Sequence, residues 1–315
     1  MKNFVFGYGS LICSQSRAIT APTLKDAVAE PVVIRNIERT WSARVVWEPA
    51  PELPVAKSSA HSSKDFDASD AVQVVNRDHI EGWTPMGVRF RKGAKCNGVL
   101  IHVDDEELAR FDIREAGYGR HKIDLVDVFH HLENSDQEDG QVSPQPISAL
   151  DGVQCNECRF LLEKASEKRF KKAVGDNVDA DVISSNISVW VYVQSVDLAP
   201  NPSYPITQSY VDIIVRGCLK ISHDFAQMFL ETTKGWWQDK QQHTDECSGA
   251  VNEVDTYQSA QGEKNEDSHH IWVDDRHAPM YVRADRQFSF EKGAEIDNLI
   301  EKHHPNALKR RVLSL

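Results

Sequence analysis

Short runs of apolar residues, separated by turns rich in glycine and proline, recur along the first 130 or so positions and again near position 190. Residues 4–6, 32–34 and 98–103 are the clearest runs. Each predicts a buried β-strand, because it is short, continuous and rich in aromatic or β-branched side chains. Further strands are expected at 41–47, 72–75, 87–90, 122–129, 189–193 and 271–273. The pattern therefore predicts a fold built on a sheet.

Helical patterns stand between and after these strands. Asp104 follows the strand at 98–103, and Glu107 stands three residues later, a spacing that predicts a capping box at a helix N-terminus. This helix is expected to reach about Ala116 and to end at the glycines that follow. Other helices are expected at 14–18, 159–174, 210–219 and 296–302, so the C-terminal part is expected to be mostly helical.

Three stretches lack a regular apolar pattern. Residues 48–71 are rich in Pro, Ser and Ala, and 132–188 hold an acidic loop and a basic helical stretch, so both are expected to be insertions. Residues 238–270 are polar and are expected to form a mobile loop. We therefore expect one domain over residues 1–235, which carries the two insertions, and a C-terminal extension over 236–315.

Composition and charge narrow the class of protein. The 315 residues are 40% hydrophobic and 27% charged, which is typical of a soluble globular protein. A formal net charge of −12 disfavours nucleic acid or an anionic membrane as a partner, because both reward excess lysine and arginine. No apolar run is long enough for a membrane span. Six scattered cysteines and an N-terminus unlike a leader predict a reducing compartment, the cytoplasm first and an organelle as the alternative.

The first strand runs into the turn Gly7-Tyr8-Gly9-Ser10. Glycines let a backbone come close to a ligand, and successive amides in such a turn can gather their N–H groups around a carboxylate or an oxyanion. A dinucleotide fingerprint would need a third glycine near Ile12, and a P-loop would need a Gly-Lys-Ser/Thr ending; neither follows the turn. The turn therefore predicts a site for a small anion or carbonyl rather than for a nucleotide.

A glutamate stands where the helix that follows the capping box should be apolar. At about 100° per residue, Leu108, Phe111 and Glu115 fall within roughly 60° of one another. Arg110 and Arg114 are expected on the opposite face. A buried carboxylate is costly, and burial raises the pKa of a carboxyl group toward values useful for proton transfer. Glu115 is therefore a candidate general acid/base.

Two other interpretations of this helix face are open. Glu115 would be structural if it capped its neighbours or paired with an arginine at the helix end. Asp112 shares the face, and it is the other candidate for the buried acid. On helix geometry alone, the structural interpretation is favoured.

No metal site is expected from the cysteines and histidines. Cys155 and Cys158 have the spacing of half a zinc site, but no second pair of that kind stands elsewhere in the sequence. Paired histidines occur at 130–131, 269–270 and 303–304, and adjacent residues point in different directions, which is poor geometry for one metal ion.

Two motifs stand about a hundred residues apart: Phe6-Gly7-Tyr8-Gly9-Ser10-Leu11 after the first strand, and Arg114-Glu115-Ala116-Gly117-Tyr118 at a helix end. Together they resemble the γ-glutamylcyclotransferase-like superfamily. The form Gly-Tyr-Gly-Ser-Leu is most similar to the ChaC-type, glutathione-degrading branch, since other γ-glutamylcyclotransferases usually carry Tyr-Gly-Ser-Asn. The basic-aromatic stretch 39–44 and the segment 202–217 fit as well. The resemblance covers roughly residues 1–130 and 187–235.

This resemblance implies an α+β fold, a mixed barrel-like sheet with flanking helices, and no metal or organic cofactor. It implies cleavage of a small γ-glutamyl amide, in which the substrate's own α-amine attacks the γ-carbonyl and releases 5-oxoproline together with an amine, amino acid or dipeptide. By position, Glu115 is the expected acid/base, and the expected binding turn consists of Gly7, Tyr8, Gly9, Ser10 and Leu11. Tyr118 and Arg44 are further candidates, for the pocket wall and for pairing the substrate carboxylate.

A non-catalytic binding or regulatory protein with the same pocket is the alternative, and the presence of Glu115 argues against it. A related reaction on a larger γ-glutamyl acceptor is a third interpretation, because the insertions and the C-terminal extension depart from the compact pattern of the family. The sequence specifies neither the γ-glutamyl compound nor the oligomeric state.

Overall fold

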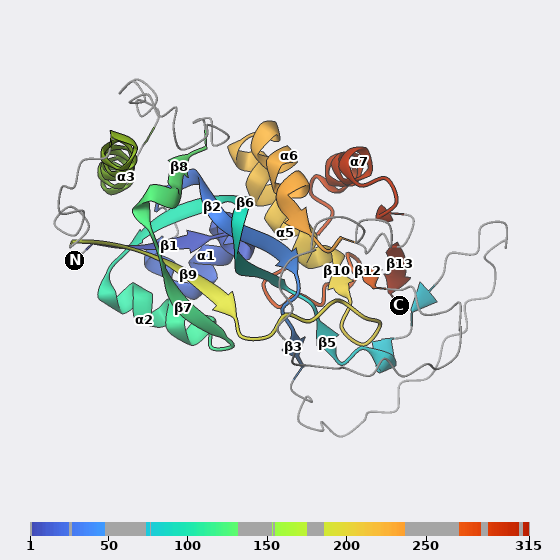
Figure 1. Cartoon of the computed structure of the whole chain (residues 1–315). Coiled ribbons are helices and arrows are strands. Elements are labelled where there is room, and N and C mark those ends of the chain that lie inside the picture. The colour runs from blue at the N-terminus through green and yellow to red at the C-terminus, as the bar shows by residue number, and fades with distance from the viewer. Residues whose placement is uncertain are drawn as a thin grey trace, which may run out of the picture.

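The computed structural model describes residues 2–24, 27–47, 74–75, 77–131, 153, 155–174, 186–236, 271–284, 289–308 and 311–314. At its centre lies a seven-stranded mixed sheet of order β11-β2-β6-β1-β9-β7, with β8 also paired to β2 (Figure 1). Its strands are β1 (Lys2–Gly7), β2 (Ala29–Trp41), β6 (Met86–Val103), β7 (Tyr118–Ile123), β8 (Val128–His130), β9 (Ile187–Gln194) and β11 (Thr233–Lys234). β1 is antiparallel to β6 and parallel to β9, so the strand that leads into the glycine turn lies inside the sheet.

The strands expected at 87–90 and 98–103 are parts of one long strand, β6. Residues 95–97 extend the antiparallel ladder with β2, where Lys95 pairs with Arg35 and Asn97 with Val33. Residues 91–94 have no partner in that ladder, because the register shifts at a bulge between Arg35 and Ile37 of β2. Much of this middle part of β6 is exposed and shows no apolar run in the sequence. β6 therefore continues on both sides of a bulge that the side-chain pattern does not reveal.

The strand expected at 41–47 is wrong. β2 ends at Trp41, and beyond it only β3 (Val45–Val46) pairs, with β5 (Gly82–Trp83). The strand expected at 122–129 is also displaced, because β7 begins earlier and a 3-10 turn at Leu125–Asp127 separates it from β8. Asp124 caps that turn by accepting a hydrogen bond from the Val126 amide, which explains why the extended chain is interrupted there.

Side-chain hydrogen bonds, rather than a backbone ladder, link the first part of β6 to β9 and β7. Gln194 at the end of β9 accepts a hydrogen bond from the Val88 amide of β6 at 2.7 Å. The Tyr118 hydroxyl, at the start of β7, donates to the Met86 carbonyl at 3.2 Å. Within the described strands the hydrogen-bonded order is an open path, so the barrel-like character that the resemblance implies is not confirmed. The architecture is α+β with a mixed sheet.

Six α-helices flank the sheet in the described part of the chain: α1 (Ser14–Thr20), α2 (Asp105–Arg114), α3 (Asn156–Val174), α5 (Gln208–Ile221), α6 (His223–Thr232) and α7 (Gly293–His303). α2 lies beside β7, whereas α5, α6 and α7 lie together on another side of the molecule (Figure 1). α3 packs against β8 through a fully buried stripe that includes Leu161 and Leu162. None of these helices is both long and apolar enough to cross a membrane.

A second, four-stranded sheet brings the C-terminal residues back to the main body. Its strands are β10 (Ile206–Thr207), β12 (Trp272–Asp274), β13 (Arg311–Ser314) and β4 (Val74–Val75), and all three pairings are parallel. β10 leads directly into α5, so the segment from residue 271 is anchored beside that helix. The expected insertion 48–71, most of 132–188 and the expected loop 238–270 lie outside the described residues.

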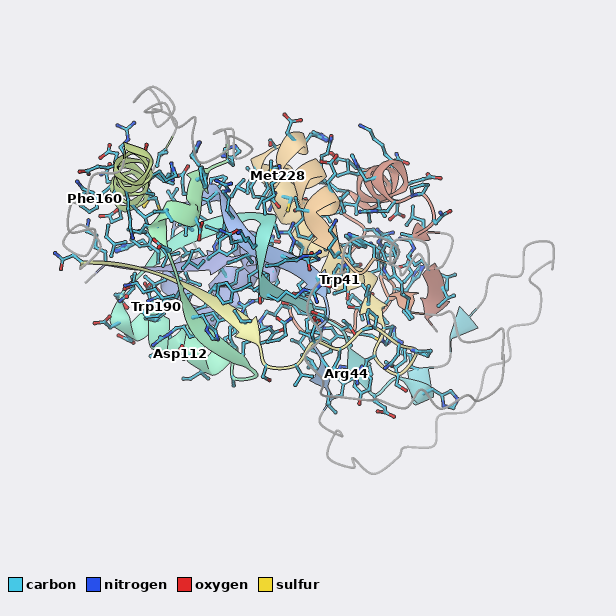
Figure 2. The ribbon with its side chains drawn as sticks, viewed as in Figure 1. Trp41, Arg44, Asp112, Phe160, Trp190 and Met228 are labelled. Atoms are coloured by element: carbon cyan, nitrogen blue, oxygen red, sulfur yellow. The ribbon has the colours of Figure 1, made fainter. Side chains whose placement is uncertain are left out.

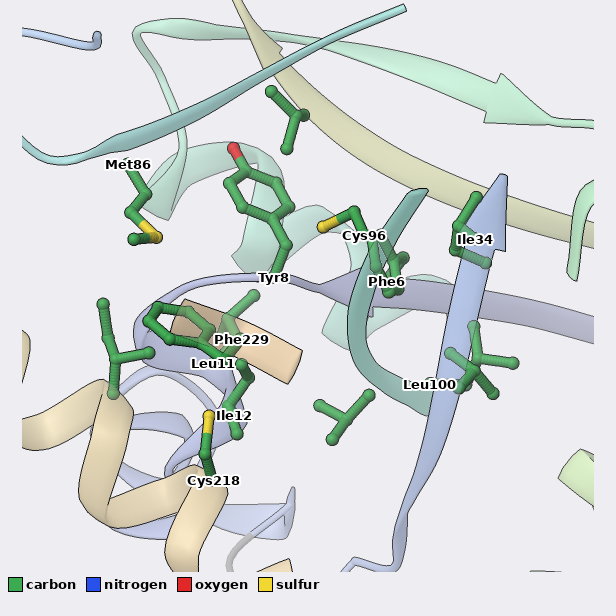
Figure 3. Packing of buried hydrophobic residues seen from close by; sticks show 14 of the residues in the cluster. Phe6, Tyr8, Leu11, Ile12, Ile34, Met86, Cys96, Leu100, Cys218 and Phe229 are labelled. Carbon is green, nitrogen blue, oxygen red and sulfur yellow. The ribbon is translucent and has the colours of Figure 1, made fainter. Parts of the chain in front are cut away.

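An apolar core surrounds β1 (Figure 3), and the fully buried cation of Arg39 contacts it through Phe229. Arg39 of β2 is 0% exposed, and its ring-stacked guanidinium lies 3.9 Å from the centre of the Phe229 ring. Its nitrogens donate to the carbonyls of Tyr8, Asn97 and Phe229 and to the hydroxyls of two threonines at the end of α6. Burial lowers the pKa of Arg39, and these acceptors compensate for the lost hydration. Arg39 thereby fixes the start of the glycine turn.

Candidate active site

A cavity of about 120 Å³ opens where the glycine turn meets the end of α2. Typical sites for drug-sized ligands are about 300 Å³ or larger, so this cavity suits a small polar group. The residues that line it are Phe6, Tyr8, Gly9, Ser10, Leu11, Val45, Trp83, Pro85, Met86, Arg114, Glu115, Tyr118, Tyr192, Tyr210, Tyr281 and Arg283. The structure therefore brings together six of the eight residues expected from the sequence, namely Tyr8, Gly9, Ser10, Leu11, Glu115 and Tyr118.

The turn after β1 is a short 3-10 helix, Ser10–Ile12, that presents backbone amides to the cavity. It is closed by hydrogen bonds from the Ile12 and Cys13 amides to the carbonyls of Gly9 and Ser10, at 2.9 and 3.2 Å. Within the described residues, no hydrogen bond has the amide of Gly9, Ser10 or Leu11 as its donor. The first amides of any helical turn lack a partner within the turn, so these three are available to a ligand.

Glycine is required in the turn at two positions for different reasons. A Cβ atom on Gly9 would lie 3.0 Å from the Tyr210 hydroxyl, on the cavity side of the turn. A Cβ atom on Gly7 would lie 2.6 Å from the Leu11 Cβ atom, closer than two carbons approach. Gly7 does not line the cavity, and its place in the structure is beneath the turn, where it lets the chain fold back on itself. Figure 3 shows Tyr8, Leu11 and Ile12 following one another around this turn.

The predicted capping box starts α2, the helix that carries Glu115 at its other end. The Glu107 amide donates to Asp104 Oδ1 at 2.7 Å, and the Asp104 amide donates to Glu107 Oε2 at 3.0 Å. The helix ends at Arg114, and Glu115 is its C-cap residue, with φ −100° and ψ 31°. The side chain of Glu115 is 19% exposed, so it is mostly buried, as its place on the apolar stripe predicts.

Arg114 corrects the helix-face prediction. It was expected on the solvent face with Arg110, but its side chain is only 5% exposed, whereas that of Arg110 is 41% exposed and pairs with Glu106. Arg114 is the last residue of the helix, so no further turn blocks its long side chain from curling toward the cavity. Periodicity alone cannot predict this, because it assumes that the helix continues.

The guanidinium of Arg114 ties the acid, the glycine turn and α1 together. Its Nε donates to Glu115 Oε1 at 2.8 Å, and its Nη2 donates to the Ser10 hydroxyl at 2.9 Å. Its Nη1 donates to the Ser16 carbonyl at 3.2 Å and to the Thr20 hydroxyl. A charge-assisted fork of this kind holds two groups at fixed separation. Pairing with an arginine at the helix end, one of the two open interpretations, is therefore observed.

That pairing leaves half of the carboxylate available. The pair uses Glu115 Oε1, and within the described residues no hydrogen bond reaches Glu115 Oε2. One oxygen is thus oriented by Arg114, while the other can accept a proton from a bound group. A structural ion pair and a role in proton transfer are compatible in this geometry.

Tyrosines form most of the remaining wall. The Tyr8 hydroxyl donates to the Tyr192 carbonyl at 2.7 Å, and the Tyr192 hydroxyl donates to Asp112 Oδ1 at 2.7 Å. Burial raises the pKa of Tyr8, Tyr118 and Tyr210 well above the ordinary phenol value, and the Glu115 carboxylate adds to each shift. These phenols therefore stay protonated and act as hydrogen-bond donors.

Asp112 and Arg44 lie outside the cavity. The carboxylate of Asp112 is 44% exposed and pairs with Arg120 at 2.8 Å, so it is not the buried acid of α2. Arg44 lies 4.2 Å from the centre of the Tyr204 ring and donates to the Ala199 carbonyl at 3.4 Å. In Figure 2 it lies near β3 and β5, well away from Asp112 on α2. The structure does not bring Arg44 to the cavity.

Two residues from the C-terminal segment complete the site. Tyr281 is 3% exposed, its ring centre lies 4.7 Å from that of Tyr210, and its hydroxyl has no hydrogen-bond partner among the described residues. Arg283 lines the cavity nearby and forms no ion pair with a described residue. Sequence reasoning missed both, because the second sheet, not a local motif, brings them to the turn.

Comparisons with known proteins add coarse likenesses. The sequence matches no protein-family profile and no curated protein. The structure is similar to a solved γ-glutamyl cyclotransferase, at TM-score 0.36 and 11% identity over 80% of this chain and 95% of the other. It is also similar to the structure of the uncharacterized human protein loc79017, at TM-score 0.36 and 12% identity, over 80% of this chain and 94% of the other. The solution structure of At3g28950.1 from Arabidopsis thaliana is similar at TM-score 0.23 and 20% identity, over 42% of this chain and 55% of the other. At these values the likeness does not decide an activity.

Proposed function

We propose that the protein cleaves a small γ-glutamyl amide by intramolecular cyclisation and releases 5-oxoproline together with an amine, an amino acid or a dipeptide. One observation carries this proposal: the free amides of the glycine turn and the half-free carboxylate of Glu115 line the same small cavity. The two motifs that carry the resemblance to the γ-glutamylcyclotransferase-like superfamily thus converge in space from positions about a hundred residues apart.

The reaction needs a group that moves protons, and Glu115 is suited to that role. The substrate's α-amine is an ammonium at neutral pH, so it must lose a proton before it can attack the γ-carbonyl. Glu115 Oε2 takes that proton and returns it to the leaving nitrogen as the C–N bond breaks. The ring nitrogen loses its second excess proton by the same route, so the amine leaves as an ammonium and Glu115 ends as a carboxylate. Arg114 orients the carboxylate through Oε1 during both transfers and is a positioning residue.

The glycine turn stabilises charge that develops on the substrate. The tetrahedral intermediate places a negative charge on the γ-carbonyl oxygen, and preorganised backbone N–H donors stabilise such a charge most where water is excluded. The Ser10 and Leu11 amides are the proposed donors, and Tyr8 and Tyr118 form the surrounding wall. A five-membered ring closes within one molecule, so the proposed reaction needs no protein nucleophile.

The proposed substrate carries a γ-glutamyl group, and the motif Gly-Tyr-Gly-Ser-Leu favours the ChaC-type branch, so glutathione belongs first in a test panel. γ-Glutamyl amino acids and γ-glutamyl amines complete the panel. We place the reaction in the cytoplasm, where the six cysteines stay reduced. Gly7 supports the turn from beneath, whereas Arg44, which packs against Tyr204 outside the cavity, has no role in the proposed mechanism.

Substitution of Glu115 by Gln tests the proposal. Glu115→Gln keeps the shape of the side chain and one acceptor for Arg114, but it removes the proton carrier. We expect a folded protein that forms 5-oxoproline at least about 100-fold more slowly. Asp112→Asn is the matched control, because it removes a carboxylate from the same helix outside the cavity. Undiminished turnover in Glu115→Gln would contradict the mechanism, and no turnover of any panel member by the folded wild type would favour the binding-protein alternative.

A further inference from the structure

A second cavity, of about 510 Å³, lies directly behind the candidate active site. It is lined by α1, α5 and the segment around Ala284. Three stretches of chain contribute to both cavities, because residues 9–14, 209–213 and 281–284 each have members in the two linings. Arg283 lines both, so the two cavities adjoin at this side chain.

The lining of the second cavity carries more positive than negative side chains, although the protein as a whole is acidic. Three cations line it, Arg216 and Lys220 from α5 and Arg283 from the C-terminal segment. Its one lining carboxylate, Asp212, is already neutralised by Arg276, whose Nε donates to Asp212 Oδ2 at 2.7 Å. The chain as a whole has a net charge of −12, so this local excess of cations stands out and would attract an anion.

Two buried polar atoms in this wall have no partner. Arg216 is 4% exposed, and its Nε donates to no described residue, while its Nη1 reaches the partly exposed Glu291 only at 3.4 Å. The hydroxyl of Ser16, which is 1% exposed, is also without a partner among the described residues. Buried polar groups in native proteins are almost always paired with protein, water or ligand. The guanidinium of Arg216 therefore keeps donor capacity that the described residues do not use.

We propose that this second cavity binds the anionic group, a carboxylate or a phosphate, of a small organic molecule. The cations supply the charge, and the side chains of Ala18, Ile19 and Ile213 supply an apolar wall for the rest of the ligand. The anion has two sources: a separate small molecule, or the acidic end of a longer substrate that passes Arg283 from the first cavity. The chemistry at Arg216 and Lys220 is the same for both.

Calorimetric titration of the full chain tests the site without any need for turnover. The probes are inorganic phosphate and succinate at constant ionic strength, with chloride as the reference anion. We expect saturable binding to one site that Lys220→Gln and Arg216→Gln each weaken at least about tenfold, the usual effect of losing one charge-assisted contact. Lys122→Gln is the matched control, since this exposed lysine on β7 lines neither cavity. Lys220 is also exposed, so Lys220→Gln carries the test if Arg216→Gln fails to fold.

The outcomes separate the site from the proposed reaction. No saturable binding of either probe, or equal binding by wild type, Lys220→Gln and Lys122→Gln, would overturn the site whether or not the protein forms 5-oxoproline. Repeating the titration with γ-glutamyl compounds present identifies the source. Phosphate displaced only by compounds with an acidic leaving part indicates one long substrate, and phosphate that stays bound indicates a separate ligand.

Discussion

Arg114 and Glu115 are neighbours in the sequence that also form an ion pair, with 2.8 Å between Arg114 Nε and Glu115 Oε1. Adjacent helical residues normally point about 100° apart. They meet here because α2 ends between them, which lets the arginine curl back over the helix terminus. The same guanidinium holds the Ser10 hydroxyl, so the distance between the acid and the glycine turn depends on one side chain.

Arg114→Gln should therefore reduce both stability and turnover. The substitution removes an ion pair and several hydrogen bonds around a side chain that is 5% exposed, and we expect a loss of about 1–3 kcal/mol in the free energy of unfolding. Turnover should fall at least about tenfold, because Glu115 loses its orienting partner. Urea unfolding and a 5-oxoproline assay measure the two effects. Arg110→Gln, on the exposed face of α2, should stay within about 0.5 kcal/mol of wild type; equal behaviour of the two variants would refute the positioning role.

Gly7→Ala should destabilise the protein through the turn. Its Cβ atom would lie 2.6 Å from the Leu11 Cβ atom, and neither carbon is the end of a flexible side chain. Overpacking of this kind costs about 1–3 kcal/mol. Gly117→Ala is the control, because no atom lies within 4 Å of the added Cβ atom there. Thermal melting of the two variants decides the matter, and a Gly7→Ala protein as stable as Gly117→Ala would show that the turn can relax.

Tyr281→Phe should separate stability from function. The buried Tyr281 hydroxyl has no partner among the described residues, and a buried unpaired polar group costs about 1–3 kcal/mol, so its removal should leave the folded protein as stable or more stable. If that hydroxyl donates to bound substrate, KM should rise about tenfold while stability is kept. Tyr204→Phe, whose hydroxyl bonds Glu81 outside the cavity, serves as the control. An unchanged KM in Tyr281→Phe would exclude a substrate contact.

Stability should fall as the pH is lowered from about 7.5 to 5.5. Burial lowers the pKa of His304, whose Nε2 lies 2.9 Å from the Leu230 carbonyl, and burial also lowers the pKa of His131. An unfolded histidine titrates near 6.5, so below that pH the unfolded chain binds protons that the folded chain resists. Acid therefore favours unfolding in this window. Urea unfolding at several pH values should show a shallower slope for His304→Asn than for wild type, and an unchanged slope in that variant would contradict the prediction.

Structural features set by residues close together in the sequence were predictable, and features set by pairing between distant segments were not. The capping box of Asp104 and Glu107 was confirmed because both partners lie within one turn of each other. The long strand β6 was divided in two, because its exposed middle carries no apolar pattern and bulges out of the ladder with β2, which resumes on the other side. Patterning reports which side chains are buried, and it does not show that one strand continues beyond a bulge.

The residues of the candidate site also fall into those that the sequence predicted and those that it did not. Glu115 and the glycine turn could be picked out because each departs from its local pattern, a charge on an apolar stripe and two glycines after a strand. Tyr281 has no such mark, since a tyrosine in an irregular segment is ordinary. Its place in the site arises only when β12 pairs with β10 and brings Tyr281, about 70 positions after Tyr210 in the sequence, against that ring.

The buried guanidinium of Arg39 makes the glycine turn part of a larger cooperative unit. It donates to the Tyr8 carbonyl on one side and to Phe229 and Thr233 at the end of α6 on the other. If α6 frayed alone, a cation would be left in the apolar core without half of its acceptors, which costs far more than an ordinary frayed end. The hydrogen-bonded amides of β1, which leads into the turn, and those near Phe229 should therefore exchange with solvent hydrogen together, and as slowly as the central strands.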